Sequence, residues 1–343
     1  MANHRSAGRT KKTALTADTD KDDQIPAEFL ERLGQIIPIA QLSSVLASFA
    51  TEKAIAFRIN TLADSRDSII DEMIQLGIPL EPVDWFKDEH GAPLAFKTPA
   101  IHRKTLTHSD SINEGKIYLQ NVSSMLAPWI LDPRPGETVL DLAAAPGGKT
   151  TQLAQQMRNA GVLSAVESVR SRMYKLQANL QRCHVEIAKT YLTDGRTVGQ
   201  KTPERFDRVL LDAPCSSEAR FQADDPASWS TWSLRKLRET ARKQVGLLKA
   251  AIHATKIGGE VLYCTCSFAP EENEQVVDKV LHKFSTAIEL IPFEMPVSNV
   301  IPGLVQFADK EFDPQVVHCR RVLPNDFMDG FFMAKFRKLN RTV

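Results

Sequence analysis

Two cysteines in this chain directly follow apolar segments that predict strands, which is where many folds hold a reactive thiol. Cys215 comes after the strand predicted over 208–211, and Cys266 comes after the strand predicted over 261–264. Cys266 also precedes a helix that Pro270 is expected to open, and a helix N-terminus favours a thiolate. Cys215 and Cys266 are therefore the candidate reactive thiols. We interpret the other three cysteines as the buried packing residues that most cysteines are: Cys183, Cys264 and Cys319.

The second candidate feature is a glycine turn between a strand and a helix. A strand is predicted over 139–142, and the turn Ala143-Ala144-Ala145-Pro146-Gly147-Gly148 leads into a helix. Such a turn presents backbone N–H groups at the carboxyl edge of a sheet, where polar or nucleotide-like ligands bind. Its glycines let the backbone approach a ligand closely. The turn is neither Gly-x-x-x-x-Gly-Lys nor Gly-x-Gly-x-x-Gly, so a tight turn without a ligand is the alternative.

Acidic side chains close the two strands that follow the turn. Glu167 ends the strand predicted over 162–166, at the position where an acid accepts hydrogen bonds from ribose hydroxyls. Asp194 follows the strand predicted over 187–192, where it could meet the edge of a base. Each acid alone could be a helix N-cap. Together with the glycine turn, they predict a site for a cofactor that contains adenosine.

Strands and helices alternate from residue 116 onward, which predicts an α/β fold with a doubly wound, mostly parallel sheet. A long helix from Leu234 is expected to end at Gly258-Gly259. The composition of the first residues is that of a disordered tail, and a small α+β module follows it. We therefore predict three segments: a tail over 1–24, an N-terminal α+β domain over 25–115, and a catalytic domain over 116–343.

Composition excludes several classes of protein. The 343 residues carry a net charge of +1, so overall charge does not indicate a nucleic-acid binder. The two basic clusters, at 170–182 and 235–243, have the pattern of solvated helix faces. No run approaches the ~18 apolar residues of a membrane span. No Cys-x-x-Cys pair indicates a metal site. An odd number of cysteines without a signal peptide predicts a reducing compartment, the cytoplasm.

Beyond these patterns, three motifs resemble the Sun-type (Fmu-type) RNA cytosine-5 methyltransferases, and most of all their bacterial ribosomal-RNA members. The motifs are the glycine turn continued through Lys149-Thr150, Leu211-Asp212-Ala213-Pro214-Cys215-Ser216, and Tyr263-Cys264-Thr265-Cys266-Ser267 with Glu271-Glu272-Asn273-Glu274. Further matches are Phe57-Arg58-Ile59-Asn60-Thr61, Tyr118-Leu119-Gln120, Ser123-Ser124-Met125 and Arg321-Val322-Leu323-Pro324. The resemblance covers about residues 25–340 and implies a Rossmann-like fold that uses S-adenosyl-L-methionine.

The resemblance also implies a role for each candidate residue. Cys266 would attack carbon 6 of cytosine, Cys215 would assist release, and Asp212 would hold the base edge with Lys149 near the reacting groups. A thiolate at carbon 6 turns carbon 5 into a nucleophile. The implied cofactor contacts are Ala144, Ala145, Pro146, Gly147, Gly148, Lys149, Glu167, Arg172, Asp194 and Asp212.

The chain departs from the family pattern after Ser216, where the family has glycine and this chain has Ser217-Glu218-Ala219-Arg220. That loop is expected to lie against the target nucleotide. No appended RNA-binding module is expected, so recognition is assigned to residues 25–115, the basic helices or a partner such as a ribosomal subunit. Ribosomal RNA is the favoured substrate and transfer RNA the alternative, for a protein expected to be a monomer.

Two other classes of function compete with this interpretation. A catalytically silent RNA-binding assembly factor would keep the fold, but it would have no need for the cysteines and the glycine turn. A methyltransferase for a small molecule or a protein would not need paired cysteines at two strand ends.

Overall fold

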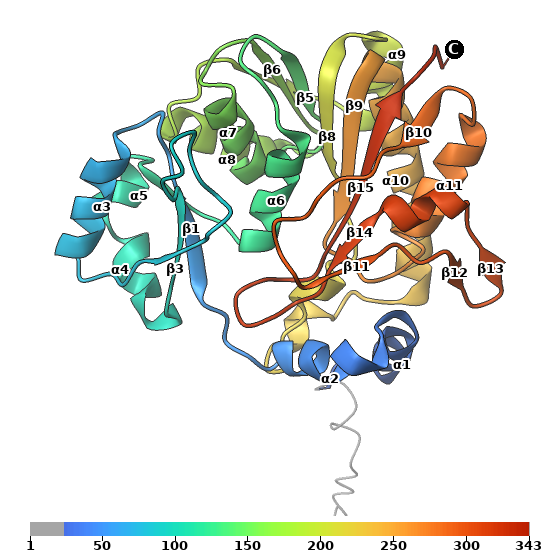
Figure 1. Ribbon diagram of the computed structural model, residues 1–343, viewed down its shortest axis with the longest axis horizontal. Helices are drawn as coiled ribbons and strands as arrows, with labels where there is room; N and C mark the ends of the chain where they lie inside the picture. Colours follow the sequence, from blue (N-terminus) through green and yellow to red (C-terminus); the bar gives the residue numbers. More distant parts are fainter. Residues whose placement is uncertain (1–23, 343) are drawn as a thin grey trace, which may run out of the picture.

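The computed structural model describes residues 24–342, so the tail expected over 1–24 lies outside the described part of the chain except for its last residue. Two sheets organise these residues (Figure 1). The smaller one is antiparallel, in the order β2-β3-β1-β4. Its strands are β1 Ile55–Ile59, β2 Glu81–Pro82, β3 Ala95–Thr98 and β4 Ile117–Leu119, and its helices are α3 Arg66–Gln75, α4 Arg103–Thr107 and α5 Asp110–Asn113. β4 follows the predicted boundary at 115, and the division into domains stays a prediction.

The larger sheet confirms the predicted α/β fold. Its strands follow the order β11-β14-β15-β9-β8-β5-β6-β7, with β10 paired to β15. The five strands from β9 to β7 are parallel. The remaining pairs are antiparallel: β15 with β9, β14 and β10 with β15, and β11 with β14. The bounds are β5 Thr138–Asp141, β6 Val162–Glu167, β7 Ala188–Leu192, β8 Phe206–Asp212, β9 Thr255–Thr265, β10 Ile288–Leu290, β11 Val300–Pro302, β14 Arg320–Val322 and β15 Phe331–Lys338. The strand order reverses at β5, which places the glycine turn at the switch point where such sheets bind ligands.

Helices cover both faces of the large sheet, because alternate strand residues point to opposite faces. Leu163 and Leu210 belong to the core that includes α6 Val122–Leu131 and α7 Gly148–Gln156. Val209 and Leu211 point the other way, into the core formed with α10 Leu234–Ala254 and α11 Glu274–Lys283. The remaining elements are α8 Arg170–Arg182, α9 Val198–Lys201 and the hairpin β12 Gln306–Phe307 with β13 Lys310–Glu311.

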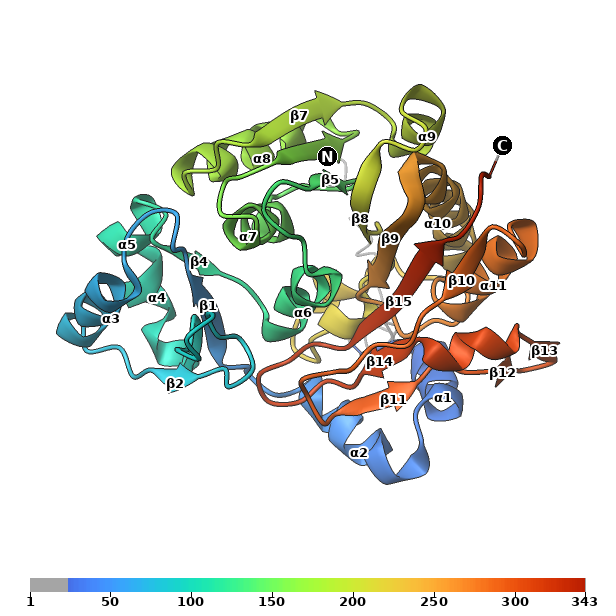
Figure 2. The same cartoon turned by 45° about the horizontal axis from the view of Figure 1, so that its top comes forward.

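The first two helices, α1 Ala27–Ile36 and α2 Ile39–Ser48, lie apart from the smaller sheet and beneath the β11–β14 end of the larger one (Figures 1 and 2). The ring of Phe29 in α1 is 4.9 Å from that of Phe221 and 6.5 Å from that of Phe268. Arg32 pairs with Glu271 at 2.7 Å. The start of the described chain therefore packs against the loops that follow β8 and β9.

Two predicted helix boundaries are wrong. α10 ends at Ala254, and the chain enters β9 before reaching the glycine pair. A side chain at Gly259 would meet the carbonyl oxygen of Asp207 at 2.7 Å, so glycine lets β9 pass β8 where their register shifts. The glycines therefore shape a strand instead of ending a helix. Pro270 also opens no helix: residues 270–273 form turns, and α11 begins at Glu274.

Candidate active site

The two candidate thiols lie in contact at the carboxyl edge of the large sheet. β8 and β9 are parallel neighbours in which Asp212 stands opposite Cys264. The chain leaves both strands at the same edge, and the sulfurs of Cys215 and Cys266 lie 3.2 Å apart. Cys266 is 9% exposed, and Cys215 is half-buried. The structure therefore brings together the two cysteines that the sequence singled out.

The surroundings of the two thiols shift their pKa values in opposite directions. The hydrogen bond from Cys215, and then the charge of Arg220, lower the pKa of the Cys266 thiol. The same sulfur–sulfur contact and burial raise the pKa of Cys215. The helix N-terminus expected to favour the Cys266 thiolate is not beside it, because α11 begins only at Glu274 and the dipole acts over the first turn. The asymmetry makes Cys266 the better nucleophile of the pair.

Lys149 and Asp212 form an ion pair next to the cysteines. The Lys149 ammonium at the start of α7 donates to Asp212 at 2.6 Å and to the Ser124 hydroxyl on α6 at 2.8 Å. The other Asp212 oxygen accepts from the Cys264 thiol at 3.6 Å. About a third of the Asp212 side chain is exposed, at 32%. The carboxylate is thus fixed on one side and open on the other, where a base edge can reach it.

The glycine turn leaves the end of β5 at the switch point. Gly147 has φ +112°, a conformation that favours glycine, and Gly148 begins α7. Behind the turn, the Thr150 hydroxyl donates to one oxygen of Asp141 at 2.7 Å. The other Asp141 oxygen is buried and has no hydrogen-bond partner among the described residues. Burial raises the pKa of Asp141 to about 6.

The acids of the neighbouring strands differ in how they are held. Glu167, at the end of β6, accepts from the backbone N–H groups of Ser168 and Val169 at 2.8 Å each. Arg172 joins this carboxylate to the turn: it lies 3.5 Å from Glu167 and donates to the Ala145 carbonyl at 2.7 Å. Asp194 instead pairs with Arg196 at 2.6 Å and is partly exposed.

These residues fit S-adenosyl-L-methionine in chemical type. The turn, with Gly147 at positive φ, lets a ligand approach the backbone closely. The unpartnered oxygen of Asp141 and the carboxylate of Glu167 can accept hydrogen bonds from the cofactor, and Arg172 can pair with its carboxylate. Asp194 would have to share its carboxylate with Arg196. The contact roles predicted for the individual residues stay predictions.

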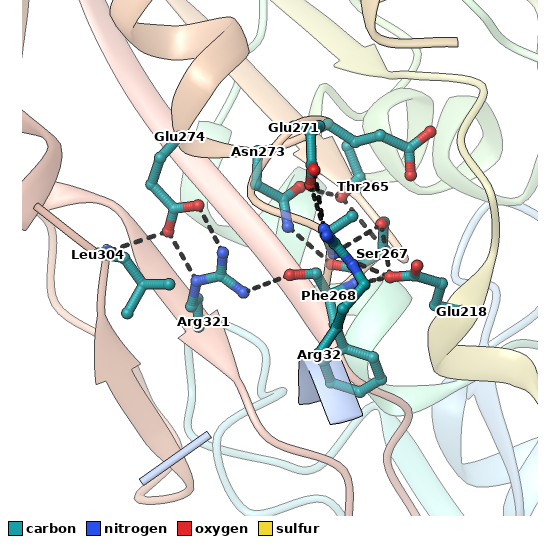
Figure 3. Close-up of polar contacts among 12 residues, drawn as sticks. Arg32, Glu218, Thr265, Ser267, Phe268, Glu271, Asn273, Glu274, Leu304 and Arg321 are labelled. Carbon is teal, nitrogen blue, oxygen red and sulfur yellow. Dashed lines mark hydrogen bonds and ion pairs between the residues drawn. The ribbon is translucent and has the colours of Figure 1, made fainter. Parts of the chain in front are cut away.

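The loop that departs from the family pattern is tied to the segment after Cys266. Ser217 has φ +61°, which explains why glycine suits this position. Glu218 is 2% exposed, and one of its oxygens accepts from the backbone N–H groups of Phe268 at 2.9 Å and Ala269 at 2.8 Å. Figure 3 shows Glu218 beside Ser267 and Phe268. The buried carboxylate therefore holds the two cysteine loops together.

Arg321 supports the same segment from β14. Its guanidinium donates to the Phe268 carbonyl at 2.9 Å and to Glu274 at 2.6 Å (Figure 3). Arg321 is 3% exposed and Glu274 is fully buried. The loop after Cys266 is thus fixed at the backbone on two sides, by Glu218 and by Arg321.

Sequence reasoning missed three residues of this site as individual candidates, whereas Asp141 belongs to the polar residues that it places at strand carboxyl ends. Ser124 and Glu272 lie within matched motifs, and Arg220 lies in the departing loop, the segment 217–220 that differs from the family pattern. Their position in or beside a matched motif is the sequence feature that could have indicated a role in the site. Glu272 is fully buried and accepts from the backbone N–H of Ser216 at 3.0 Å and from its hydroxyl at 2.5 Å.

The smaller sheet closes the site from one side through Arg58 on β1. This arginine is fully buried and donates to Gln120 at 3.1 Å and to Gln155 on α7 at 2.5 Å. It also bonds to Thr151. Next to it, a cavity of about 860 Å³ is lined by residues 49–56 and by Arg103, Gln222 and Asp329. The cavity runs from the small module toward the departing loop.

Within residues 24–342, no three or more His, Cys, Asp or Glu side chains are grouped so that they could hold a metal ion. No helix in the same range is long and apolar enough to cross a membrane.

Comparison with known proteins finds RNA methyltransferases among the similar sequences. Ribosomal RNA small subunit methyltransferase F of Vibrio campbellii is 35% identical over 325 residues, which is 92% of this chain and 63% of that protein. The tRNA (cytosine(49)-C(5))-methyltransferase of Pyrococcus abyssi is 36% identical, over 82% of this chain and 88% of its own. The crystal structure of a methyltransferase homologue from Pyrococcus horikoshii, 31% identical, superposes with a TM-score of 0.76 over 92% of this chain and 96% of its own.

This chain spans a little under two thirds of the length of the methyltransferase F relatives that it matches. Residues 128–337 match the family described as 16S rRNA methyltransferase RsmB/F. This range holds the glycine turn, both cysteine loops and Arg321. The chain therefore belongs to the RsmB/F family of RNA methyltransferases.

Proposed function

We propose that this protein methylates carbon 5 of a cytosine in RNA through a covalent bond between Cys266 and carbon 6 of the base. The observation that carries the proposal is the contact between the Cys215 and Cys266 sulfurs at 3.2 Å, beside the Lys149–Asp212 pair. A methyl transfer to a nucleophilic oxygen or nitrogen needs no thiol. Cytosine carbon 5 does, because the ring carbon becomes nucleophilic only after a thiolate adds to carbon 6.

The residues of the site suit a reaction that proceeds in three steps: addition of the thiolate, methyl transfer and release. The Cys266 thiolate forms a bond to carbon 6, and the electron pair moves toward the ring nitrogen and carbonyl edge. A proton carried by Asp212 passes to the ring nitrogen and takes up that electron pair, and Lys149 holds the carboxylate that Asp212 becomes until the proton returns after methyl transfer. S-adenosyl-L-methionine is the cofactor and would supply the methyl group, to which carbon 5 forms its new bond as the bond between that methyl and the cofactor's sulfur breaks. A base then removes the proton from carbon 5, and the carbon–sulfur bond breaks to restore the Cys266 thiolate. Cys215, in contact with that sulfur, assists this release.

We favour ribosomal RNA as the substrate. The relatives named for the small ribosomal subunit match 92% of this chain. The tRNA methyltransferase relative makes transfer RNA the alternative. Arg103 lines the cavity beside the site and could contact the phosphates of a bound strand, whereas Lys53 in the same lining is paired with Asp329. We propose that the protein acts in the cytoplasm as a monomer, on free RNA or on a ribosomal subunit.

The test is the capture of a covalent adduct. We would express Cys215→Ala in a cell that lacks the native gene, denature the extract, isolate protein bound to RNA, and sequence that RNA. Loss of the release thiol should trap the RNA on Cys266, and Cys215→Ala/Cys266→Ala should abolish the adduct. The sequenced RNA would separate ribosomal from transfer RNA.

Two results would overturn parts of the proposal. If Cys215→Ala traps nothing while the wild type makes 5-methylcytosine, the thiol roles are misassigned. If the wild type also fails to methylate total RNA and ribosomal subunits, the silent assembly factor becomes the better explanation.

A further inference from the structure

The departing loop places a hydroxyl group on the proposed nucleophile. The Cys266 sulfur lies 3.6 Å from the Ser217 hydroxyl oxygen, within hydrogen-bond distance for sulfur. Ser217 reaches this position with φ +61° and ψ 28°, in the left-handed region. A residue other than glycine in that region costs roughly 1 kcal/mol of strain. The chain thus keeps a strained serine where glycine would relieve the strain.

The backbone around Ser217 fixes where its hydroxyl points. The N–H of Ala219 donates to the Cys266 carbonyl at 3.1 Å. Glu218 accepts from the backbone N–H groups of Phe268 and Ala269, which follow Cys266 in the chain, and its other oxygen accepts from the Trp232 indole at 2.7 Å. The residues flanking the Ser217–Cys266 contact are therefore bonded across it, so the contact is built into the loop.

We propose that Ser217 is a positioning residue that donates a hydrogen bond to the Cys266 thiolate and holds its sulfur in place for attack on the base. This inference rests on the proposed function of Cys266. In the resting protein the thiol donates to the Ser217 oxygen. A thiolate has no proton to donate, so on ionisation the serine hydroxyl turns and becomes the donor. The family glycine has no group that can do this.

Three other groups act on the Cys266 sulfur and must be kept constant in a test. Cys215 contacts it directly, Arg220 favours the thiolate by its positive charge, and Asp212 opposes it by its negative charge. The Ser217 hydroxyl carries no charge, so its removal changes a hydrogen bond without changing the net charge at the site.

The experiment compares Ser217→Ala and Ser217→Gly with the wild type. The rate of Cys266 alkylation by iodoacetamide is measured against pH without RNA, and the alkylated peptide is identified by mass spectrometry so that Cys215 is counted separately. Loss of one hydrogen bond to a charged group predicts that the midpoint of the Cys266 curve rises by about 1 pH unit in both variants. Ser217→Gly should not lower the melting temperature, because glycine relieves the strain.

The matched control is Ser216→Ala, whose hydroxyl bonds to Glu272 and Ser267 instead of to the sulfur. It should leave the Cys266 midpoint within the error of the wild type. An unchanged midpoint in both Ser217 variants, or an equal shift in all three variants, would overturn the proposal. The measurement uses no RNA, so a wild type that fails to methylate RNA refutes the proposed function separately.

Discussion

Replacing Glu272 by glutamine should remove the pH dependence of stability that this side chain causes. The carboxyl is fully buried beneath the Cys215 loop, and burial raises its pKa from the ordinary 4.5 to about 7. The folded protein therefore holds a proton here that the unfolded chain releases above pH 4.5. Glu272 contributes stability that is fully present below about pH 4.5 and is lost as the pH rises through about 7.

The size of the effect follows from the shift. The pKa of Glu272 rises by about 2.5 on folding, and each unit corresponds to about 1.36 kcal/mol. The unfolding free energy should therefore fall by about 3 kcal/mol between pH 4.5 and 7.5. Glutamine has nearly the same shape and does not ionise. The unfolding free energy of Glu272→Gln minus that of the wild type should therefore rise with pH by about 3 kcal/mol over this range.

Urea unfolding followed by tryptophan fluorescence at several pH values measures this difference. Glu186→Gln, at an exposed position, is the control for losing one carboxylate and should show little dependence on pH. A difference for Glu272→Gln that stays constant from pH 4.5 to 7.5 would refute the reasoning. It would mean that Glu272 is ionised throughout and that its bonds to Ser216 outweigh burial.

Two further predictions concern the smaller sheet. Arg58→Met should lower the unfolding free energy by about 3 kcal/mol, because it leaves Gln120 and Gln155 without their buried partner. The control is Arg134→Met, which breaks an exposed ion pair and should lower the unfolding free energy by less than about 1 kcal/mol in the same urea titration. Arg103→Ala should weaken binding of a 16S ribosomal RNA transcript and reduce the slope of log Kd against log salt by about 1, as measured by filter binding. An unchanged slope would remove Arg103 from the RNA-binding surface.

The fold and the placement of the site could be predicted from sequence because both depend on local patterns. Apolar segments that each end in a polar residue predicted parallel strands, and parallel strands place those ends at one edge. Asp212, Cys215 and Cys266 therefore lie together as expected. The glycine turn and Glu167 follow the same rule on β5 and β6.

Other features depend on contacts that no local pattern contains. Gly258-Gly259 has the pattern of a helix end, but its role is set by β8, a distant segment that β9 must pass. Pro270 can open a helix or a turn, and here the turn brings Glu272 under Ser216. The sequence shows a serine at position 217 where the family has glycine. Its contact with the Cys266 sulfur could not be predicted, because hydrogen bonds between two loops set the conformation of Ser217.

The packing of α1 has a consequence for how the chain is made. Arg32 and its partner Glu271 are 239 residues apart in sequence, and Phe29 stacks near Phe221 and Phe268. During synthesis this helix emerges early, with only Phe49 of its aromatic partners close by in sequence, and its contacts with Phe268 and Glu271 form only after the segment that follows β9 has left the ribosome. Such a long-range contact closes late in folding. The cysteine loops therefore gain the support of α1 only after the chain has been synthesised past Glu271.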